Sequence, residues 1–465
     1  MLESNEIKFG TDGWRGVISD NFTFKNVRRV AQAIADYFNA RTKPAKLAVG
    51  FDTRFLSREY AQAVAEVLSA NNIEVLLADN ATPTPMLSFK VKNNNQTAGV
   101  MITASHNPAD YNGIKIKTAT GGAAGVEITQ EVERMANAIT ETRLEPKARI
   151  IKEDFAGEYV RFLRSYIDIK KLKNSRFKVL VDSMHGSGDK FIAQVLKGSS
   201  IKLEFTRADI NPSFGGLRPE PVAENLEATM KKMKEGKFDI CLVLDGDADR
   251  IACVAPGGEF ISPQKILGLL ALHLHQDRKM SGGLVKTIVG SNMMDNIAEK
   301  LGLKLYETPV GFKYISNLMD TKDILVGGEE AGGMGFKGYI PERDGSMAGL
   351  LLLEMMAFRK KNFLKILAEA EKEFGKYFYL RDDLRIPDIK VDYDALKKVK
   401  TVCGKEVVQV KDYDGVKLIL KDSSWLMFRG SGTEPIMRVY AESKNLKTTK
   451  ELLAFGRKLI LPDAL

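Results

Sequence analysis

The chain has 465 residues, 44% of them hydrophobic, and a formal net charge of +9. This length predicts several domains of about 150 residues each. We expect no membrane span, since no apolar run reaches the ~18 residues that one needs, and no signal peptide. The three cysteines suit neither a metal cluster nor a set of disulfides, which favours a cytoplasmic location. The scattered lysines argue against nucleic-acid binding, although their charge can attract an anionic substrate.

Helical and strand-like patterns alternate along most of the chain. The first part predicts helices over residues 27–38 and 60–70 and strands over 46–51, 73–77 and 98–102. Such alternation indicates a largely parallel sheet covered by helices. The pattern starts again twice, with strands expected at 177–182, 239–244 and 284–289, and helices near 191–196, 263–275 and 292–300.

The last part of the chain differs. One long helix is expected over residues 346–374, then strands over 416–420, 425–428 and 437–440 and a helix over 448–461. We therefore predict three related α/β domains with mixed sheets and a C-terminal α+β domain. The boundaries that we expect are 1–152, 153–257, 258–370 and 371–465.

A short polar segment, residues 103–108, follows the strand expected at 98–102. It places the hydroxyl of Ser105 just beyond the strand's carboxyl end, where ligands collect in α/β sheets. Pro108 disfavours helical backbone at Asn107, so a turn is expected here. Taken alone, the segment is equally well explained as an ordinary polar turn.

An acidic loop, residues 245–250, follows the apolar strand expected at 239–244. Asp245, Asp247 and Asp249 alternate with small residues and can converge on one cation, and Mg²⁺ suits such hard oxygen ligands. An EF-hand loop is excluded, because Arg250 and Pro256 stand where glycine and glutamate would be required. The remaining alternative is a solvated acidic turn.

Two glycine-rich loops are candidates for ligand binding. Residues 429–435 combine Arg429 with glycines and hydroxyls, as in a phosphate cradle, and Arg438 can face the same site. In residues 327–333, glycines let a ligand approach the backbone while a carboxylate binds sugar hydroxyls. Either loop could also be a plain turn. Three further basic residues are candidate phosphate ligands: Arg15, Lys286 and Lys313.

The histidines add little by themselves. His273 and His275 lie on an expected helix and are interpreted as structural or surface residues. His106 adjoins Ser105, but adjacency does not establish a nucleophile and base, and no G-x-S-x-G motif is present.

Taken together and in order, these motifs resemble those of the α-D-phosphohexomutases, the phosphoglucomutase and phosphomannomutase superfamily. Residues 9–16 resemble its N-terminal motif, 103–108 its phosphoserine loop and 245–250 its metal loop. Residues 328–332 resemble its sugar-binding loop and 429–435 its phosphate-binding loop. The resemblance covers essentially the whole chain and implies four domains around one central cleft.

The resemblance implies a phosphoryl shuttle. Ser105 would carry a phosphoryl group, and Ser105, Asp245, Asp247 and Asp249 would hold one Mg²⁺. A sugar monophosphate would accept the group, become a hexose 1,6-bisphosphate, turn over and return its other phosphate to Ser105. Lys115, His106 and Arg15 would assist the reaction. The implied substrate-binding residues are Arg250, Lys286, Thr308, Gly311, Lys313, Glu329 and Ala331, and the implied phosphate-binding residues are Arg429, Ser431, Gly432, Thr433 and Arg438.

Two positions depart from the family pattern. Ala331 stands where the sugar loop often has serine, and Gly333 stands where many members have histidine, so another group must handle any proton there. Residues 308–313 and 215–221 look more like the phosphoglucomutase branch. Phosphomannomutase or dual specificity is the alternative, and phosphoglucosamine mutase fits less well because of Glu330. Free bisphosphate is the implied activator, and the chain is expected to be a monomer or homodimer.

Two functions of other classes compete with this one. A metal-dependent phosphatase would use the same acidic loop with water as acceptor. A non-catalytic sugar-phosphate-binding protein would not need Ser105, the three aspartates and Lys115 together.

Overall fold

The computed structural model describes residues 6–10, 12–385, 391–430 and 436–461. The chain forms two compact units. The first comprises residues up to Gly282 and residues Gly311–Ile366, and the second comprises Gly283–Val310 and the residues from Leu367 onward. Among the described residues, no helix has both the length and the apolarity that crossing a bilayer requires.

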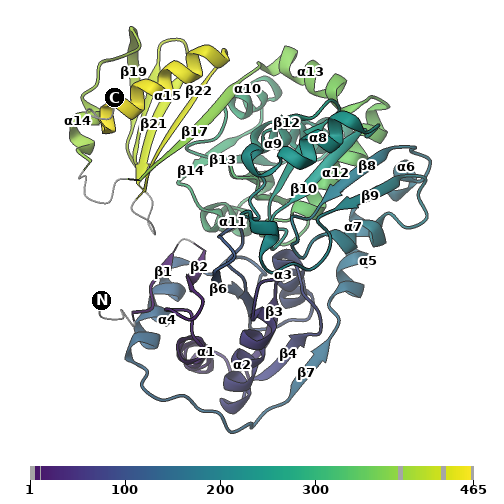
Figure 1. Ribbon diagram of the computed structural model, residues 1–465, viewed down its shortest axis with the longest axis vertical. Coiled ribbons are helices and arrows are strands. Elements are labelled where there is room, and N and C mark those ends of the chain that lie inside the picture. Colours follow the sequence, from purple (N-terminus) through teal and green to yellow (C-terminus); the bar gives the residue numbers. More distant parts are fainter. Residues whose placement is uncertain (1–5, 11, 386–390, 431–435, 462–465) are drawn as a thin grey trace. The chain divides into compact units, whose positions relative to one another are not determined.

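The first sheet has seven strands in the order β1-β2-β6-β5-β3-β4-β7. Strands β3, β4, β5 and β7 run parallel, whereas β6, β2 and β1 continue the sheet antiparallel. Helices α1, α2 and α4 pack together beside it, and α3 packs against β3, β5 and β6 (Figure 1). The bounds are β1 Phe9–Gly10, β2 Gly13–Val17, α1 Phe24–Asn39, β3 Lys46–Phe51, α2 Ser57–Ala70, β4 Glu74–Ala78, α3 Thr84–Asn93, β5 Ala98–Ile102, β6 Tyr111–Thr118, α4 Val126–Ala138 and β7 Ile150–Glu153.

The second sheet has the order β12-β11-β10-β8-β9 and repeats this design. Strands β8, β9 and β10 are parallel, and β11 and β12 continue the sheet antiparallel. The bounds are α5 Ala156–Tyr166, α6 Ile169–Lys173, β8 Lys178–Asp182, α7 Asp189–Val195, β9 Lys202–Thr206, α8 Glu227–Glu235, β10 Ile240–Leu244, β11 Ile251–Ala255 and β12 Glu259–Ile261.

The third segment contains two strand pairs. Strands β13 and β14 pair in parallel, and β15 and β16 pair antiparallel. The bounds are α9 Pro263–Leu272, β13 Gly283–Thr287, α10 Asn292–Leu301, β14 Leu305–Thr308, α11 Phe312–Thr321, β15 Ile324–Gly328, β16 Met334–Phe336, α12 Gly345–Arg359 and α13 Phe363–Phe374.

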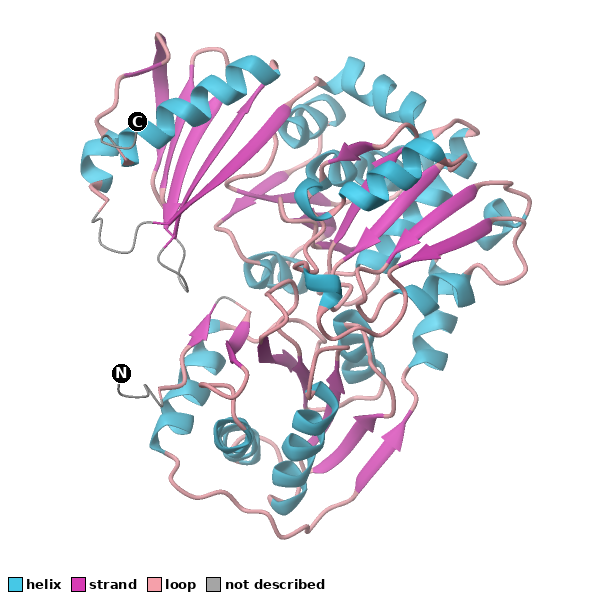
Figure 2. Cartoon of the chain, in the orientation of Figure 1, coloured by secondary structure: helices cyan, strands magenta, loops and turns pink. Residues whose placement is uncertain are grey.

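The C-terminal segment is an antiparallel sheet in the order β17-β22-β21-β20-β19-β18, with α15 packed along β17, β21 and β22 (Figure 2). The bounds are β17 Phe378–Arg385, α14 Tyr393–Lys397, β18 Thr401–Val402, β19 Lys405–Lys411, β20 Val416–Leu420, β21 Trp425–Gly430, β22 Ile436–Ser443 and α15 Leu446–Ile460. The predicted fold class, α/β domains with mixed sheets and a C-terminal α+β domain, is confirmed. The four domain boundaries stay a prediction.

One expected element is wrong. Residues 346–374 form two helices instead of one, because the backbone at Lys360 turns left-handed with φ 51° and ends α12. Asn362 then caps the next helix, its side-chain oxygen accepting the amide of Lys365 at 2.8 Å. Asparagine is a favoured capping residue, so this signal was present in the sequence.

His273 has the structural role expected for it. It is fully buried just beyond α9, where its ring contacts Asp277 at 2.9 Å and Glu354 at 3.1 Å. Burial lowers the pKa of His273, but its hydrogen bonds to the two carboxylates outweigh that effect, so the pKa is raised above its usual value. The charged ring therefore stabilises the packing of α9 on α12.

This raised pKa makes stability depend on pH. The contribution of His273 is complete below about pH 6.5, the pKa of an unfolded histidine, and is lost as pH rises through the folded-state pKa. We expect the melting temperature of the wild type to fall across that window relative to His273→Asn. The free energy of unfolding changes with pH by at most about 1.4 kcal/mol per pH unit through this one group. Calorimetry between pH 6 and pH 9 measures this, and Ser165→Ala, an exposed position without a titratable side chain, is the control.

Candidate active site

Three loops of the first unit occupy the same place in three successive segments. Each connects a buried strand to its antiparallel neighbour: β5 to β6, β10 to β11, and β15 to β16. A direct antiparallel connection needs only a short loop, whereas a parallel one needs a crossover helix. These loops contain Ser105, the three aspartates and Glu329, respectively. The shared topology thus explains why the motifs recur at strand ends.

Arg54 and Asp52 hold the Ser105 loop, and sequence analysis missed both. The Arg54 guanidinium donates to the carbonyl oxygens of Ser105 at 2.7 Å, Asn107 at 2.6 Å and Pro108 at 2.7 Å. Asp52 accepts the hydroxyl of Thr103 at 2.6 Å. The only sequence signal for this support is a charged pair directly after the strand β3.

Ser105 occupies a strained and buried position. Its φ is 54°, a left-handed value that is uncommon for a residue with a side chain. Its hydroxyl donates to Asp245 at 3.1 Å and lies 3.3 Å from His106 Nδ1. Arg15 lies nearby, where it donates to Asn107 Oδ1 at 2.6 Å. The structure therefore brings Ser105, His106, Arg15 and the acidic loop together.

The carboxylates of Asp245, Asp247 and Asp249 are fully buried and offer ligand atoms within 4.8 Å of one another. Burial, with the charges of Asp249 and Asp247, raises the pKa of Asp245 well above its usual value. Burial also raises the pKa of Asp247, but Lys115 outweighs it and the net pKa is lowered. Three carboxylates this close together repel one another, and further positive charge would favour the ionised state of all three.

In two of these three carboxylates, only one of the two oxygens accepts a hydrogen bond from the protein. Lys115 Nζ lies 2.8 Å from Asp247 Oδ2 and 2.9 Å from Asp249 Oδ2. The other oxygens, Asp247 Oδ1 and Asp249 Oδ1, are buried without a hydrogen-bond partner among the described residues. Buried polar atoms are rarely left without partners. The donor set, hard oxygens beside the Ser105 hydroxyl, fits a Mg²⁺ ion.

Arg343 joins the acidic loop to the sugar loop, and sequence analysis missed it. Its guanidinium contacts Asp12, lies 2.8 Å from Asp249 and 3.4 Å from Glu329, and is 3% exposed. Burial raises the pKa of Glu329 to about 7, although the charge of Arg343 opposes the rise. The sequence places Arg343 only as a basic residue before α12.

Gly333 is explained by the path of Arg343. A Cβ atom at position 333 would lie 2.2 Å from Arg343 Cδ. The arginine side chain therefore fills the space that a side chain at this position would occupy. Glycine at this position therefore leaves room for the buried cation of Arg343.

The other predicted residues fall into two groups. In the first unit, Arg250 Nε lies 3.8 Å from Asp249, and Arg250 forms a β-bridge with Gly333. Gly311 precedes α11, and Lys313 lies on that helix. Burial lowers the pKa of Lys313, and the negative charge of Asp12 partly offsets this effect. Ala331 lies in the turn between β15 and β16.

The second unit contains the rest. Lys286 pairs with Asp295 and Glu307, and Thr308 donates to the carbonyl of Pro309 at 2.9 Å. Arg429 Nε lies 3.0 Å from Asp414, and Arg438 Nε lies 3.8 Å from Asp383. The expected phosphate ligands Ser431, Gly432 and Thr433 lie outside the described residues.

Magnesium should stabilise the fold through the acidic loop. We expect saturating Mg²⁺ to raise the free energy of unfolding by about 2.7 kcal/mol at one hundred times its Kd. Asp245→Asn should lose this increment yet be no less stable than the wild type without a divalent ion, since it removes carboxylate repulsion. Thermal unfolding with Mg²⁺ or EDTA measures both effects. The exposed variant Asp20→Asn should respond as the wild type does, and an equal response from Asp245→Asn would contradict the assignment.

A side chain at position 333 should displace Arg343. We expect Gly333→Ala to cost about 1–3 kcal/mol of stability, the usual effect of overpacking, as measured by urea denaturation. Gly157→Ala is the control, because a Cβ there would meet nothing closer than 3.5 Å. Equal stability of the two variants would show that Arg343 has room to move.

Comparisons with known proteins agree with this geometry. Three family models match, described as phosphoglucomutase/phosphomannomutase alpha/beta/alpha domains I, II and III, over residues 6–143, 157–258 and 262–374. A phosphoglucomutase/phosphomannomutase of Thermococcus kodakarensis is 30% identical over 97% of this chain and 98% of its own length. A phosphoglucosamine/phosphogalactosamine mutase of Sulfurisphaera tokodaii is also 30% identical, with the same coverage.

Solved structures share the fold. One assigned as a phosphomannomutase from Thermus thermophilus has a TM-score of 0.89 at 34% identity and covers 98% of this chain and 99% of its own. The N-acetylphosphoglucosamine mutase of Aspergillus fumigatus, solved with GlcNAc-6P and magnesium, has a TM-score of 0.63 at 18% identity, covering 99% and 96%. The chain therefore belongs to the phosphoglucomutase/phosphomannomutase family, a group of phosphohexomutase isomerases within the α-D-phosphohexomutase superfamily.

Proposed function

We propose that this enzyme interconverts hexose 1-phosphate and hexose 6-phosphate, with glucose as the preferred sugar, through a phosphoserine at Ser105. The observation that carries the proposal is the hydroxyl of Ser105, 3.1 Å from Asp245, beside two buried carboxylate oxygens that have no hydrogen-bond partner among the described residues. A nucleophile beside a cation site is the arrangement that phosphoryl transfer requires.

In the proposed reaction, phosphorylated Ser105 gives its phosphoryl group to a hydroxyl of the bound sugar phosphate. The bond between phosphorus and Ser105 Oγ breaks, a bond to the sugar oxygen forms, and the sugar becomes a 1,6-bisphosphate. The bisphosphate then turns over and returns its other phosphate to Ser105. One Mg²⁺ held by Asp245, Asp247, Asp249 and the phosphoserine would neutralise negative charge on the transferring group.

The basic residues around the site have separate roles in this proposal. Lys115 keeps its proton, because three carboxylates raise its pKa even though burial lowers it. It contacts Asp247 and Asp249 of the acidic loop and would help to pass the proton that the sugar hydroxyl loses to Ser105 Oγ, with Arg15 and His106 assisting. Arg343 fixes Glu329, which is ionised above pH 7 and accepts hydrogen bonds from sugar hydroxyls. Residues Arg250, Lys286, Thr308, Gly311, Lys313 and Ala331 would complete the substrate site.

The distal phosphate of the sugar would bind the loop after β21. Arg429 and Arg438 pair across β21 and β22, and Ser431, Gly432 and Thr433 would add hydroxyl and amide donors. We propose small-molecule sugar phosphates as the substrates, with free hexose 1,6-bisphosphate as activator and neither nucleic acid nor membrane as a partner. A cytoplasmic monomer or homodimer completes the proposal, in agreement with free thiols at Cys241, Cys253 and Cys403.

Removing the nucleophile should separate binding from turnover. We expect Ser105→Ala to lower kcat by at least about 10³-fold, since no other group can take over covalent transfer. Its Kd for glucose 1-phosphate should stay within a few-fold of the wild type. A coupled assay for glucose 6-phosphate and calorimetric titration measure the two quantities. Ser165→Ala, at an exposed helix position, is the control, and full activity of Ser105→Ala would refute the nucleophile assignment.

Substrate preference requires a kinetic panel. We expect the highest kcat/KM with glucose 1-phosphate, a lower value with mannose 1-phosphate and the lowest with glucosamine 1-phosphate, each assayed with Mg²⁺ and its 1,6-bisphosphate. A different order would revise the sugar only. Release of inorganic phosphate without isomerisation would instead identify a phosphatase, and inactivity with all three sugars would overturn the proposed function.

A further inference from the structure

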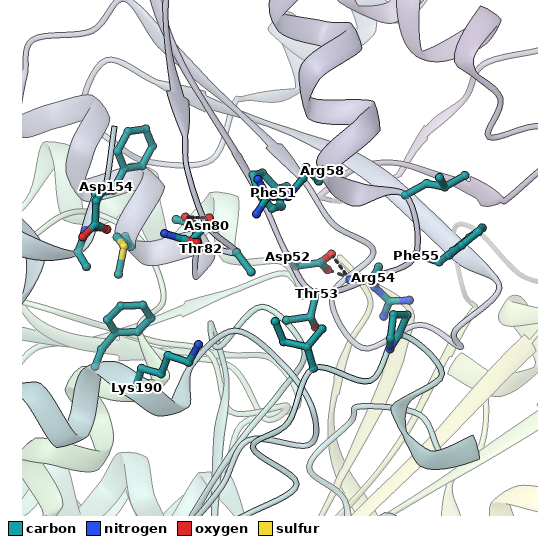
Figure 3. Close-up of a pocket in the computed structure, with 18 of the residues that line it drawn as sticks. Phe51, Asp52, Thr53, Arg54, Phe55, Arg58, Asn80, Thr82, Asp154 and Lys190 are labelled. Carbon is teal, nitrogen blue, oxygen red and sulfur yellow. Dashed lines mark hydrogen bonds and ion pairs between the residues drawn. The ribbon is translucent and has the colours of Figure 1, made fainter. Parts of the chain in front are cut away.

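A cavity that contains none of the candidate catalytic residues in its lining lies in the first unit (Figure 3). Its volume is about 550 Å³, within the ~300–1,000 Å³ typical of small-molecule sites. One side is formed where β3, β4 and β7 end, and the other by α7 and the segment after β9. Since β3, β4 and β7 run parallel, the cavity lies at the carboxyl edge of the sheet, where α/β proteins bind ligands.

The lining combines an aromatic floor with two cations that have no carboxylate partner among the described residues. Phe51, Phe155 and Phe191 are buried around it. Arg58 and Lys190 come from α2 and α7 and lie on opposite sides in Figure 3. Within the part of the chain that the structure describes, neither forms an ion pair, and the interaction found for Arg58 is with the Phe51 ring, at 5.0 Å.

Polar groups complete the lining. Asp154 accepts the amide of Ala156 at 3.0 Å, and Glu59, Asn80, Thr82 and Gln194 lie around the same space. These groups suit hydrogen bonds from amino or hydroxyl substituents of a ring, while the two cations suit a phosphate or carboxylate. Phenylalanine faces favour a flat aromatic body. The exposed lining residues include two large apolar ones, Phe55 at 56% and Ile210 at 64% exposure, beside the charged Arg58, Glu59 and Lys190.

One wall of the cavity also supports the catalytic loop. Asp52 and Arg54 line the cavity and hold Thr103 and the carbonyl of Ser105. Thr53, between them, donates to the carbonyl of His185 at 2.9 Å in the neighbouring α/β segment. A ligand bound against this wall would therefore shift the position of Ser105.

We propose that this cavity is a regulatory site for a small aromatic organic anion, the chemistry of a mononucleotide. The anionic group lies between Arg58 and Lys190, and the ring packs against the phenylalanines. Binding requires only the cavity, whereas its effect on rate rests on the proposed mutase function.

Fluorescence titration with N-methylanthraniloyl-ADP tests the binding. Saturating glucose 1,6-bisphosphate and excess Mg²⁺ occupy the catalytic site throughout. We expect one saturable site per chain in the wild type and at least a tenfold weaker Kd in Arg58→Glu/Lys190→Glu. The control Lys25→Glu/Lys202→Glu changes net charge equally at exposed lysines outside the cavity and should keep the wild-type Kd. Absence of saturable binding, or equal Kd values for the two double variants, would overturn the proposal.

Competition and kinetics complete the test. Displacement of the probe by unlabelled ADP alone identifies a nucleotide site, and displacement by phenyl phosphate as well identifies a general aromatic-anion site. Both results support the proposal. Bound probe should change kcat at least twofold in the wild type and the control variant but not in the cavity variant. An unchanged kcat at saturating probe would refute regulation. If no protein shows mutase activity, the proposed function fails, while the titration still decides whether the site exists.

Discussion

The site depends on confining three carboxylates in one buried place. Asp245, Asp247 and Asp249 lie within a few ångströms of one another without access to solvent, and repulsion at such distances is costly in a medium of low polarity. Lys115 and Arg343 relieve part of it by binding the oxygens that face them. The remaining oxygens, Asp247 Oδ1 and Asp249 Oδ1, have no hydrogen-bond partner among the described residues. This arrangement lowers the stability of the fold, as strained functional sites do, and it suits a cation bound beside Ser105.

The same kind of strand-to-strand connection carries the polar groups of this site in each α/β segment. In each of the three α/β segments, a short loop links a buried strand to an antiparallel neighbour, so the loop cannot move far from the end of its sheet. Rigid strands on both sides fix a loop more tightly than a long crossover would. The segment between β21 and β22 joins two antiparallel strands in the same way. One topological feature therefore carries the proposed nucleophile, the candidate metal ligands and the proposed sugar-binding carboxylate.

The residues that hold this site were harder to find in the sequence than those that make it up. Ser105 and the aspartates follow apolar strands in short motifs, so local pattern was enough. Arg54, Asp52 and Arg343 lie far along the chain from the loops that they support, and no local spacing marks them. Helix boundaries show the same contrast. The break at Lys360 depends on a single left-handed residue within an otherwise continuous helical pattern, although Asn362 signals the restart.

The sequence by itself determined the α/β alternation, the C-terminal change to an antiparallel sheet, and the order of the loops, because apolar periodicity and turn residues act over a few neighbours. Only the tertiary structure decided which charges meet. It placed Arg343 across Gly333, in contact with Asp249 and Glu329, and it placed Lys115 between two aspartates. It also put one wall of the cavity lined by Arg58 and Lys190 behind Ser105. Such contacts join residues separated by tens to hundreds of positions, and their energies depend on burial and distance, which a linear pattern does not contain.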